Sequence, residues 1–398
     1  MRECPIGKLK PGMVLGQPLH AYYGARRSLL LGRGAEITPA LIDRLLSIGY
    51  PAVYIEEEGT EDIAPGDILA EETTANAMQT VSEFYNEFHD ILKDISKDHD
   101  DLVAFFKKSS PFITVPRTSG LKQCVNDIKE DLFIIGSVGR YKTNSAIPRT
   151  NAIHQHAINT TILSLLLGWH FDFTDDELFE LGLGALLHDI GKLAMPELME
   201  KKYWELNSEE RLRLRDHAVV GESMLANSRP ITEMNRQIIM QHHEFQDGTG
   251  YPTGLKGNNR KPIKTLYTEP NQIFRFAEIV AVANTFDNLM SGEFTQSLLS
   301  PKKAFMELRK DAVVRYNSEI VSLIPQVVDY YPVGSNVRIV KHPNHEYQSL
   351  EGVVAKSDGK QQDQIELVLL FDANGQRIPS QRIFLDLKEA AIESIDEV

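Results

Sequence analysis

The sequence lacks most features of secreted or polymer-binding proteins. Only two of its 398 residues are cysteines, and Cys4 and Cys124 lie far apart in a spacing that fits neither a zinc site nor a redox pair. The 42 basic residues are outnumbered by 56 acidic ones, which gives a net charge of −14. That charge disfavours a general role in coating nucleic acids or anionic membranes, although a small anionic ligand needs only a local basic patch.

Long hydrophobic runs are also missing. The N-terminal segment MRECPIGKLKPGM has no apolar core of a signal peptide. The most apolar stretch, residues 158–171, is broken by polar side chains and is shorter than the roughly 20 residues of a membrane-spanning helix. Hydrophobic residues still make up 42% of the chain, enough for two or three cores. We therefore expect a cytoplasmic protein with neither a membrane nor polymeric nucleic acid as a partner.

Changes in residue composition and hydrophobic pattern divide the chain into four regions. Residues 1–62 alternate short apolar runs with glycines and predict a small mixed α/β domain. Residues 63–120, with apolar residues at helical spacing, predict a helical linker, and helical patterns continue over 121–328. Residues 329–398 contain short strand-like runs between turns. The predicted fold is mainly α, an all-helical bundle with a small N-terminal α/β unit and a small C-terminal β-barrel or sandwich.

Histidines are concentrated in the helical region, where seven of the twelve fall between positions 154 and 243. Capping boxes starting at Thr174 and Asn207 predict two helices there, the second continuing to Met224, and further helices are expected from Thr232 and over 271–290. Helical spacing puts five histidines on apolar faces: His156, His188, His217, His242 and His243.

A solvated or hydrogen-bonded ring is the simplest interpretation of any single histidine on a helix. Five such histidines and the adjacent Asp189 on separate helices of one bundle are harder to explain in this way, because buried ionisable groups are costly unless paired or coordinated. Imidazoles with a bridging carboxylate suit Fe, Mn or Zn, and five or more ligands suffice for two ions. A two-metal site clamps the attacking and leaving oxygens of a displacement at phosphorus, which indicates phosphoester hydrolysis.

Two motifs carry a specific family resemblance. The segments HDIGK at 188–192 and HHEFQDGTGYP at 242–252 resemble the signature of the HD-GYP branch of the HD phosphohydrolase superfamily. The resemblance covers about residues 121–325 and implies an HD-type helical bundle. The flanks resemble an arrangement in which a small N-terminal domain of unknown function precedes the hydrolase and a short β-rich tail follows it.

The resemblance implies hydrolysis of cyclic di-GMP to pGpG or GMP by a metal-bridging hydroxide, with two Fe or Mn ions. The implied metal ligands are His156, His188, Asp189, His217, His242, His243 and Asn284, with Asp189 bridging the ions and also counted as catalytic. Lys192 would act near a substrate phosphate or the leaving oxygen, as a catalytic and substrate-binding residue. Gly250 and Tyr251 of the glycine-rich loop are expected near the substrate, although Tyr251 packing against a helix is an alternative.

Three positions depart from the family pattern. Ala152 stands where some members have an acidic ligand for a third metal, which favours two ions. Asn284 replaces the aspartate of the late helix, and we predict that it is a weak ligand; Asp287, one turn on, is the alternative anionic partner, either as a ligand or by orienting a ligating histidine. Ser291-Gly292-Glu293-Phe294 replaces a basic segment that usually contacts substrate phosphates.

Other residues could supply the missing positive charge. Four basic residues lie within nine positions after the glycine-rich loop: Lys256, Arg260, Lys261 and Lys264. We predict that Arg260 and Lys261 bind substrate, with a solvated loop edge as the alternative. Two other functions also remain open: a catalytically weak cyclic di-GMP receptor that signals through its flanking domains, and a general nucleotide phosphohydrolase. A homodimer formed through the long helical stretch is a further open alternative.

Overall fold

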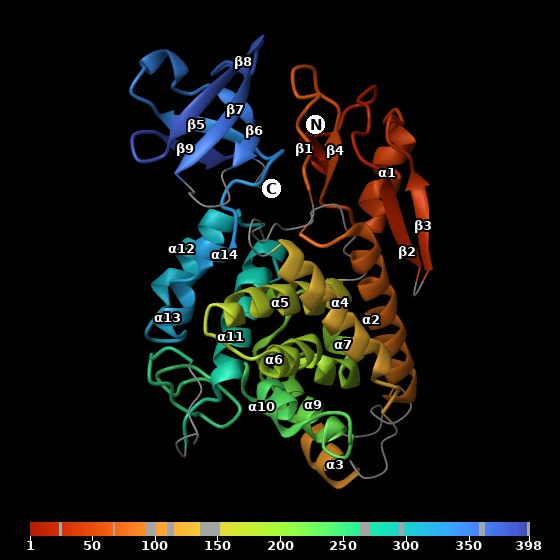
Figure 1. The fold of residues 1–398 in the computed structure, drawn as a ribbon. Helices are drawn as coiled ribbons and strands as arrows, with labels where there is room; N and C mark the ends of the chain where they lie inside the picture. The colour runs from red at the N-terminus through yellow and green to blue at the C-terminus, as the bar shows by residue number, and fades with distance from the viewer. Residues whose placement is uncertain are drawn as a thin grey trace.

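The computed structural model of the chain consists of a helical body below two smaller domains (Figure 1). It describes residues 1–23, 26–66, 68–92, 101–109, 115–135, 152–262, 271–293, 298–357 and 363–395. Among these residues, no helix has both the length and the apolar character needed to cross a bilayer.

The N-terminal domain contains two antiparallel strand pairs and one helix. Its elements are β1 (Arg2–Pro5), β2 (Leu19–Tyr23), β3 (Arg26–Leu31), α1 (Pro39–Ile48) and β4 (Ala52–Ile55). β1 pairs with β4, and β2 pairs with β3. The Thr38 side chain accepts a hydrogen bond from the backbone of Leu41 at the start of α1, and Gly49 ends the helix. This is the predicted mixed α/β unit.

The helical body encloses the largest core. Its helices are α2 (Glu71–Leu92), α3 (Leu102–Ser109), α4 (Ser119–Ile135), α5 (Ala152–Trp169), α6 (Asp175–Leu187), α7 (Pro196–Met199), α8 (Ser208–Arg215), α9 (His217–Leu225), α10 (Glu233–Gln241), α11 (Arg275–Ser291), α12 (Pro301–Lys310), α13 (Ser318–Val321) and α14 (Ile324–Val327). Tyr85 and Phe88 of α2 and Phe106 of α3 are fully buried in the same core as α5, α6 and α11. The segment predicted as a helical linker therefore packs as part of this body.

Local capping explains where several helices begin. The capping boxes predicted at Thr174 and Asn207 are both present, and they start α6 and α8. The predicted single helix from Asn207 to Met224 is wrong, because α8 ends at Arg215 and α9 begins at His217. Next to this break, Nδ1 of His217 lies 2.6 Å from the carbonyl oxygen of Leu214. The late helix α11 begins at Arg275, four residues after the predicted start.

The C-terminal domain is one open antiparallel sheet in the order β8-β7-β6-β5-β9, within the described part of the chain. Its strands are β5 (Asn336–Lys341), β6 (Glu351–Ser357), β7 (Gln364–Phe371), β8 (Arg377–Asp386) and β9 (Ala391–Ser394). The predicted closed barrel or two-sheet sandwich is therefore wrong. One face carries its own apolar cluster, while Ile63 and Val333 pack on the other, so a second sheet is not needed to bury it.

The two small domains contact each other directly. The backbone amide of Glu3 donates to the carbonyl of Gly334 at 2.8 Å, and the Asn336 side chain donates to the carbonyl of Glu3 at 2.7 Å. Arg382 of β8 forms an ion pair with Asp62. In Figure 1 both domains lie above the helical body.

Candidate metal centre

His188 and Asp189 lie where α6 ends, and the turn that follows packs tightly on α9. The 3-10 helix at Ile190–Ala194 begins directly after Asp189. A Cβ atom on Gly191 would lie 2.0 Å from the carbonyl oxygen of His217 and 2.7 Å from the backbone nitrogen of Gly221. Only glycine therefore allows this turn to approach α9 so closely, and the approach brings Asp189 to the His217 ring.

Three histidines have their ring orientation fixed by backbone carbonyls. The Nδ1 atoms of His188, His217 and His242 lie 2.7, 2.6 and 2.8 Å from the carbonyl oxygens three residues earlier. A carbonyl oxygen only accepts hydrogen bonds, so each Nδ1 carries the proton. The lone pair of each neutral ring is therefore on Nε2, the atom that faces the cluster.

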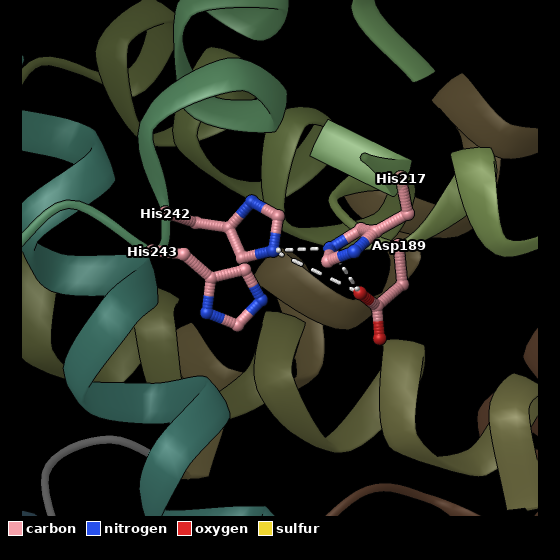
Figure 2. A group of neighbouring side chains, drawn as sticks. All are labelled: Asp189, His217, His242 and His243. Atoms are coloured by element: carbon pink, nitrogen blue, oxygen red, sulfur yellow. Dashed lines mark hydrogen bonds and ion pairs between the residues drawn. The ribbon is translucent and has the colours of Figure 1, made fainter. Parts of the chain in front are cut away.

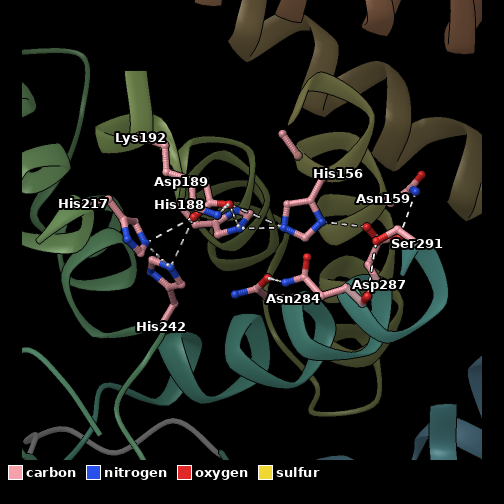
Figure 3. A network of polar contacts seen from close by, with 12 residues as sticks. His156, Asn159, His188, Asp189, Lys192, His217, His242, Asn284, Asp287 and Ser291 are labelled. Carbon is pink, nitrogen blue, oxygen red and sulfur yellow. Dashed lines mark hydrogen bonds and ion pairs between the residues drawn. The ribbon is translucent and has the colours of Figure 1, made fainter. Parts of the chain in front are cut away.

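His156 is held instead by a carboxylate. Its Nδ1 lies 2.7 Å from Oδ2 of Asp287, whose Oδ1 accepts a 2.9 Å hydrogen bond from the side chain of Asn159. Figure 3 shows His156 between Asp287 on one side and the His188 and Asp189 pair on the other. Asp287 is thus placed to orient His156, which is the role that the sequence left open for it.

Asp189 is shared by two groups of potential ligands. One contains Asp189, His217, His242 and His243, the other His156, His188 and Asp189, and in each group the ligand atoms lie within 4.8 Å of one another. Oδ1 of Asp189 faces Nε2 of His217 at 3.3 Å, and Oδ2 faces Nε2 of His188, also at 3.3 Å. Figure 2 shows the first group. The two oxygens of one carboxylate therefore face two sets of imidazoles, which is a bridging arrangement.

Several atoms that face one another in the cluster lack a hydrogen-bond donor among the described residues. Nε2 of His217 and Nε2 of His242 lie 3.2 Å apart, although both rings carry their proton on Nδ1, so two lone pairs face each other. Oδ1 of Asp189 is buried and accepts no hydrogen bond from the described residues. These donor atoms fit divalent cations, which bind neutral imidazole and carboxylate oxygen.

The protonation states suit metal binding. Burial lowers the pKa of His188 and His217, lowers that of His242 to about 4 and lowers that of His243 well below its usual value, so these rings are neutral near pH 7. Burial would raise the pKa of Asp189, but its close contacts with His188 and with the Lys192 ammonium group outweigh burial and hold that pKa well below its usual range. The centre therefore combines neutral nitrogen ligands with an ionised carboxylate.

His156 differs from the other rings in its protonation. Burial disfavours its charged form, but the hydrogen bond to Asp287 and the charge of that carboxylate outweigh burial and raise the pKa of His156. A ring made more basic by a carboxylate is also a stronger ligand once its Nε2 binds a cation.

A cavity of about 360 Å³ opens next to this centre. His156, Asp189 and Lys192 line it from the helical body, while Tyr54 of the N-terminal domain and Tyr331 before the C-terminal sheet line it from above. Its volume is in the range of small-molecule sites. Nζ of Lys192 lies 2.6 Å from Oδ2 of Asp189, so one predicted catalytic residue lies directly against the other.

The glycine-rich loop packs against His243 rather than along the cavity. The ring of Tyr251 stacks on His243, two residues after α10, with 4.6 Å between centroids; the predicted position of Tyr251 near the substrate stays a prediction. A Cβ atom on Gly250 would lie 2.5 Å from the carbonyl oxygen of His243. The Glu244 carboxylate accepts backbone hydrogen bonds from three residues of the loop: Thr253, Gly254 and Leu255. The loop therefore holds the end of α10, which the candidate ligands His242 and His243 follow.

The predicted phosphate-binding residues Arg260 and Lys261 are exposed and are not among the residues that line the cavity. Lys264 lies outside the described residues. Asn284 is buried on α11, and its side-chain oxygen accepts a hydrogen bond from Asn288. Its predicted role as a metal ligand stays a prediction.

The sequence reasoning missed three sets of residues near the centre. Lys201 and Lys202 line the cavity, and so do residues of both flanking domains. The adjacent lysines were visible in the sequence, but their direction depends on how the short α7 segment packs. Asn159, which supports Asp287, follows His156 by three residues and could have been found from helical spacing.

Comparison with protein families agrees with this architecture. Residues 146–320 match the family described as HD domain. This part of the helical body is therefore similar to HD domains. With the motifs at 188–192 and 242–252, this confirms the resemblance to the HD-GYP branch.

Individual relatives cover part of the chain. It is 30% identical over 183 residues to a cyclic di-GMP phosphodiesterase of Thermotoga maritima and 27% identical over 237 residues to the cyclic di-GMP phosphodiesterase PA4108 of Pseudomonas aeruginosa. These matches cover 45% and 60% of this chain, and the chain spans about half of the relatives' own length, 46% and 52%. A solved structure described as Bd1817, a HDG"Y"P protein from Bdellovibrio bacteriovorus, is similar over 81% of this chain and 97% of that one, with 18% identity and a TM-score of 0.42.

Proposed function

We propose that this chain hydrolyses cyclic di-GMP to pGpG or on to GMP with two divalent ions, Fe or Mn. The observation that carries the proposal is the Asp189 carboxylate, whose two oxygens face two sets of histidine nitrogens beside a cavity. The names of the related phosphodiesterases support cyclic di-GMP as the substrate.

Each side chain then has a defined task. His156, His188 and Asp189 would hold one ion, and His217, His242, His243 and Asp189 the other. When bound, such ions lower the pKa of a water molecule and stabilise the charge that develops on the phosphoryl oxygens. Lys192 both fixes Oδ2 of Asp189 and lines the cavity, so its ammonium group would donate a hydrogen bond to a phosphate oxygen of the substrate.

A cyclic di-GMP receptor with little turnover is the second candidate. Glu293 lines the cavity in the segment where the family usually has basic residues, and its negative charge would repel a phosphate. Binding without product is the behaviour expected of this alternative.

The test is a product assay on the purified full-length protein. The protein, loaded with Mn²⁺ or with Fe²⁺ without oxygen, is incubated with cyclic di-GMP or with a nucleoside monophosphate, and the products are separated by chromatography. Formation of pGpG or GMP from cyclic di-GMP alone supports the proposal. Binding of cyclic di-GMP without any product supports the receptor, and hydrolysis of the monophosphate supports a general nucleotide phosphohydrolase.

A further inference from the structure

Besides Lys192, the cavity has a second source of positive charge, which follows the HD motif in the sequence. Lys201 and Lys202 follow the short helix α7 and line the same cavity as His156, Asp189 and Lys192. Acidic residues outnumber basic ones in this chain, whose net charge is −14. Lysines lining a cavity in an acidic protein would attract an anionic ligand.

The backbone at Lys202 is held in place. Its amide donates a 2.7 Å hydrogen bond to the carboxylate of Glu205. This bond caps a short 3-10 helix at Tyr203–Glu205. Arg211 supports this helix from α8, because its guanidinium lies 5.0 Å from the centroid of the Tyr203 ring and donates to the carbonyl of Trp204. The side chain of Lys202 therefore extends from a fixed point.

The two lysines have different partners. Lys201 pairs with Glu210 of α8. Nζ of Lys202 lies 3.3 Å from the carboxylate of Glu293, which follows α11 and also lines the cavity. The side chains of Lys202 and Glu293 are 40% and 36% exposed. An ion pair this exposed contributes little to stability, so a phosphate group can replace Glu293 as the partner of Lys202.

We infer that Lys202 binds the second phosphodiester of a cyclic dinucleotide while the first lies at the histidine and aspartate centre. The inference rests on the proposed function, since a cyclic dinucleotide carries two phosphodiester charges and the metal centre accounts for one. In this arrangement Lys202 supplies the positive charge that the segment Ser291–Glu293 lacks. Glu293 competes with the substrate for Lys202 and weakens binding.

The experiment compares two substrates on the Mn²⁺-loaded full-length protein. Cyclic di-GMP carries two phosphodiesters, and bis(p-nitrophenyl) phosphate carries one. In Lys202→Met, the ratio of the KM for cyclic di-GMP to the KM for the single phosphodiester should rise about tenfold, as expected for a lost charge-assisted hydrogen bond. Glu293→Gln should lower that ratio. Lys310→Met, which removes an exposed lysine paired with Glu307 on α12, is the charge-matched control and should leave the ratio unchanged.

A second readout does not depend on turnover. Calorimetric titration of metal-free protein with cyclic di-GMP should show weaker binding for Lys202→Met than for Lys310→Met, with a larger difference at low salt. If the wild type hydrolyses cyclic di-GMP but Lys202→Met leaves the KM ratio unchanged, the role of Lys202 is overturned while the proposed function stands. A wild-type protein that cleaves only the single phosphodiester overturns the proposed function and, with it, this inference.

Discussion

Asp287 allows the two halves of the metal centre to be tested separately. It contacts Nδ1 of His156 at 2.7 Å and is only 3% exposed, whereas His217, His242 and His243 belong to the other ligand group. Replacing Asp287 by Ala removes both the anchor and the negative charge behind His156. Loss of such a supporting partner typically costs 10- to 100-fold in metal affinity, or roughly 1.4 to 2.7 kcal/mol.

We expect Asp287→Ala to weaken one of two bound ions by that factor and to leave the other nearly unchanged. Asp287→Asn should have a smaller effect, because its side-chain oxygen can still accept a hydrogen bond from His156, although the amide NH2 no longer accepts from Asn159. Titration of the metal-free protein with Mn²⁺ against a fluorescent chelator measures both affinities. Asp311→Asn, which removes an exposed carboxylate paired with Arg315, is the matched control.

The opposite result would assign the ligand differently. If Asp287→Ala binds two ions like the wild type while Asn284→Ala loses one, Asp287 has no supporting role and the Asn284 side chain is the ligand. That outcome would confirm the sequence-based prediction that Asn284 is a metal ligand. It would contradict the role of Asp287 in orienting His156.

Two further predictions concern parts of the fold that support the centre. Burial raises the pKa of Glu278 from 4.5 to about 7, so the unfolded chain loses this proton at lower pH than the folded state, and the folded state loses stability as the pH rises from 4.5 to about 7. Glu278→Gln should therefore be more stable than the wild type at pH 8, by up to about 3 kcal/mol, and this gain should vanish below pH 4.5; equal denaturant midpoints at pH 8 would contradict it. Gly250→Ala places a Cβ atom 2.3 Å from the backbone nitrogen of Phe245, so it should lower both Tm and metal affinity; wild-type values for both would show that the loop does not support His243.

Local signals in the sequence were the most reliable ones. The helix starts at Thr174 and Asn207 were predictable because a capping box depends on residues only three apart. The convergence of the histidines could be expected because each lies on the apolar face of a helix, and buried imidazoles need partners. The break at Asp216 was missed because Leu214, His217 and Gly221 continue the helical spacing across it.

Features that depend on tertiary packing could not be read from the sequence. The C-terminal strands alternate as a barrel or sandwich would, but Ile63 from a distant segment covers the second face of the single sheet. Likewise, the charges of Arg260 and Lys201 look equivalent in the sequence, yet only Lys201 lines the cavity. The direction of an exposed side chain is set by how its segment packs, which spacing alone does not encode.

The most direct test of the account is the metal content of the protein measured together with its activity. The wild type should bind about two equivalents of Fe or Mn and convert cyclic di-GMP to pGpG or GMP. The double variant His188→Ala and Asp189→Ala should keep its fold by circular dichroism but lose both metal and activity, because Asp189 is shared by both ligand groups. Full metal occupancy in that folded double variant would contradict the assignment of the centre.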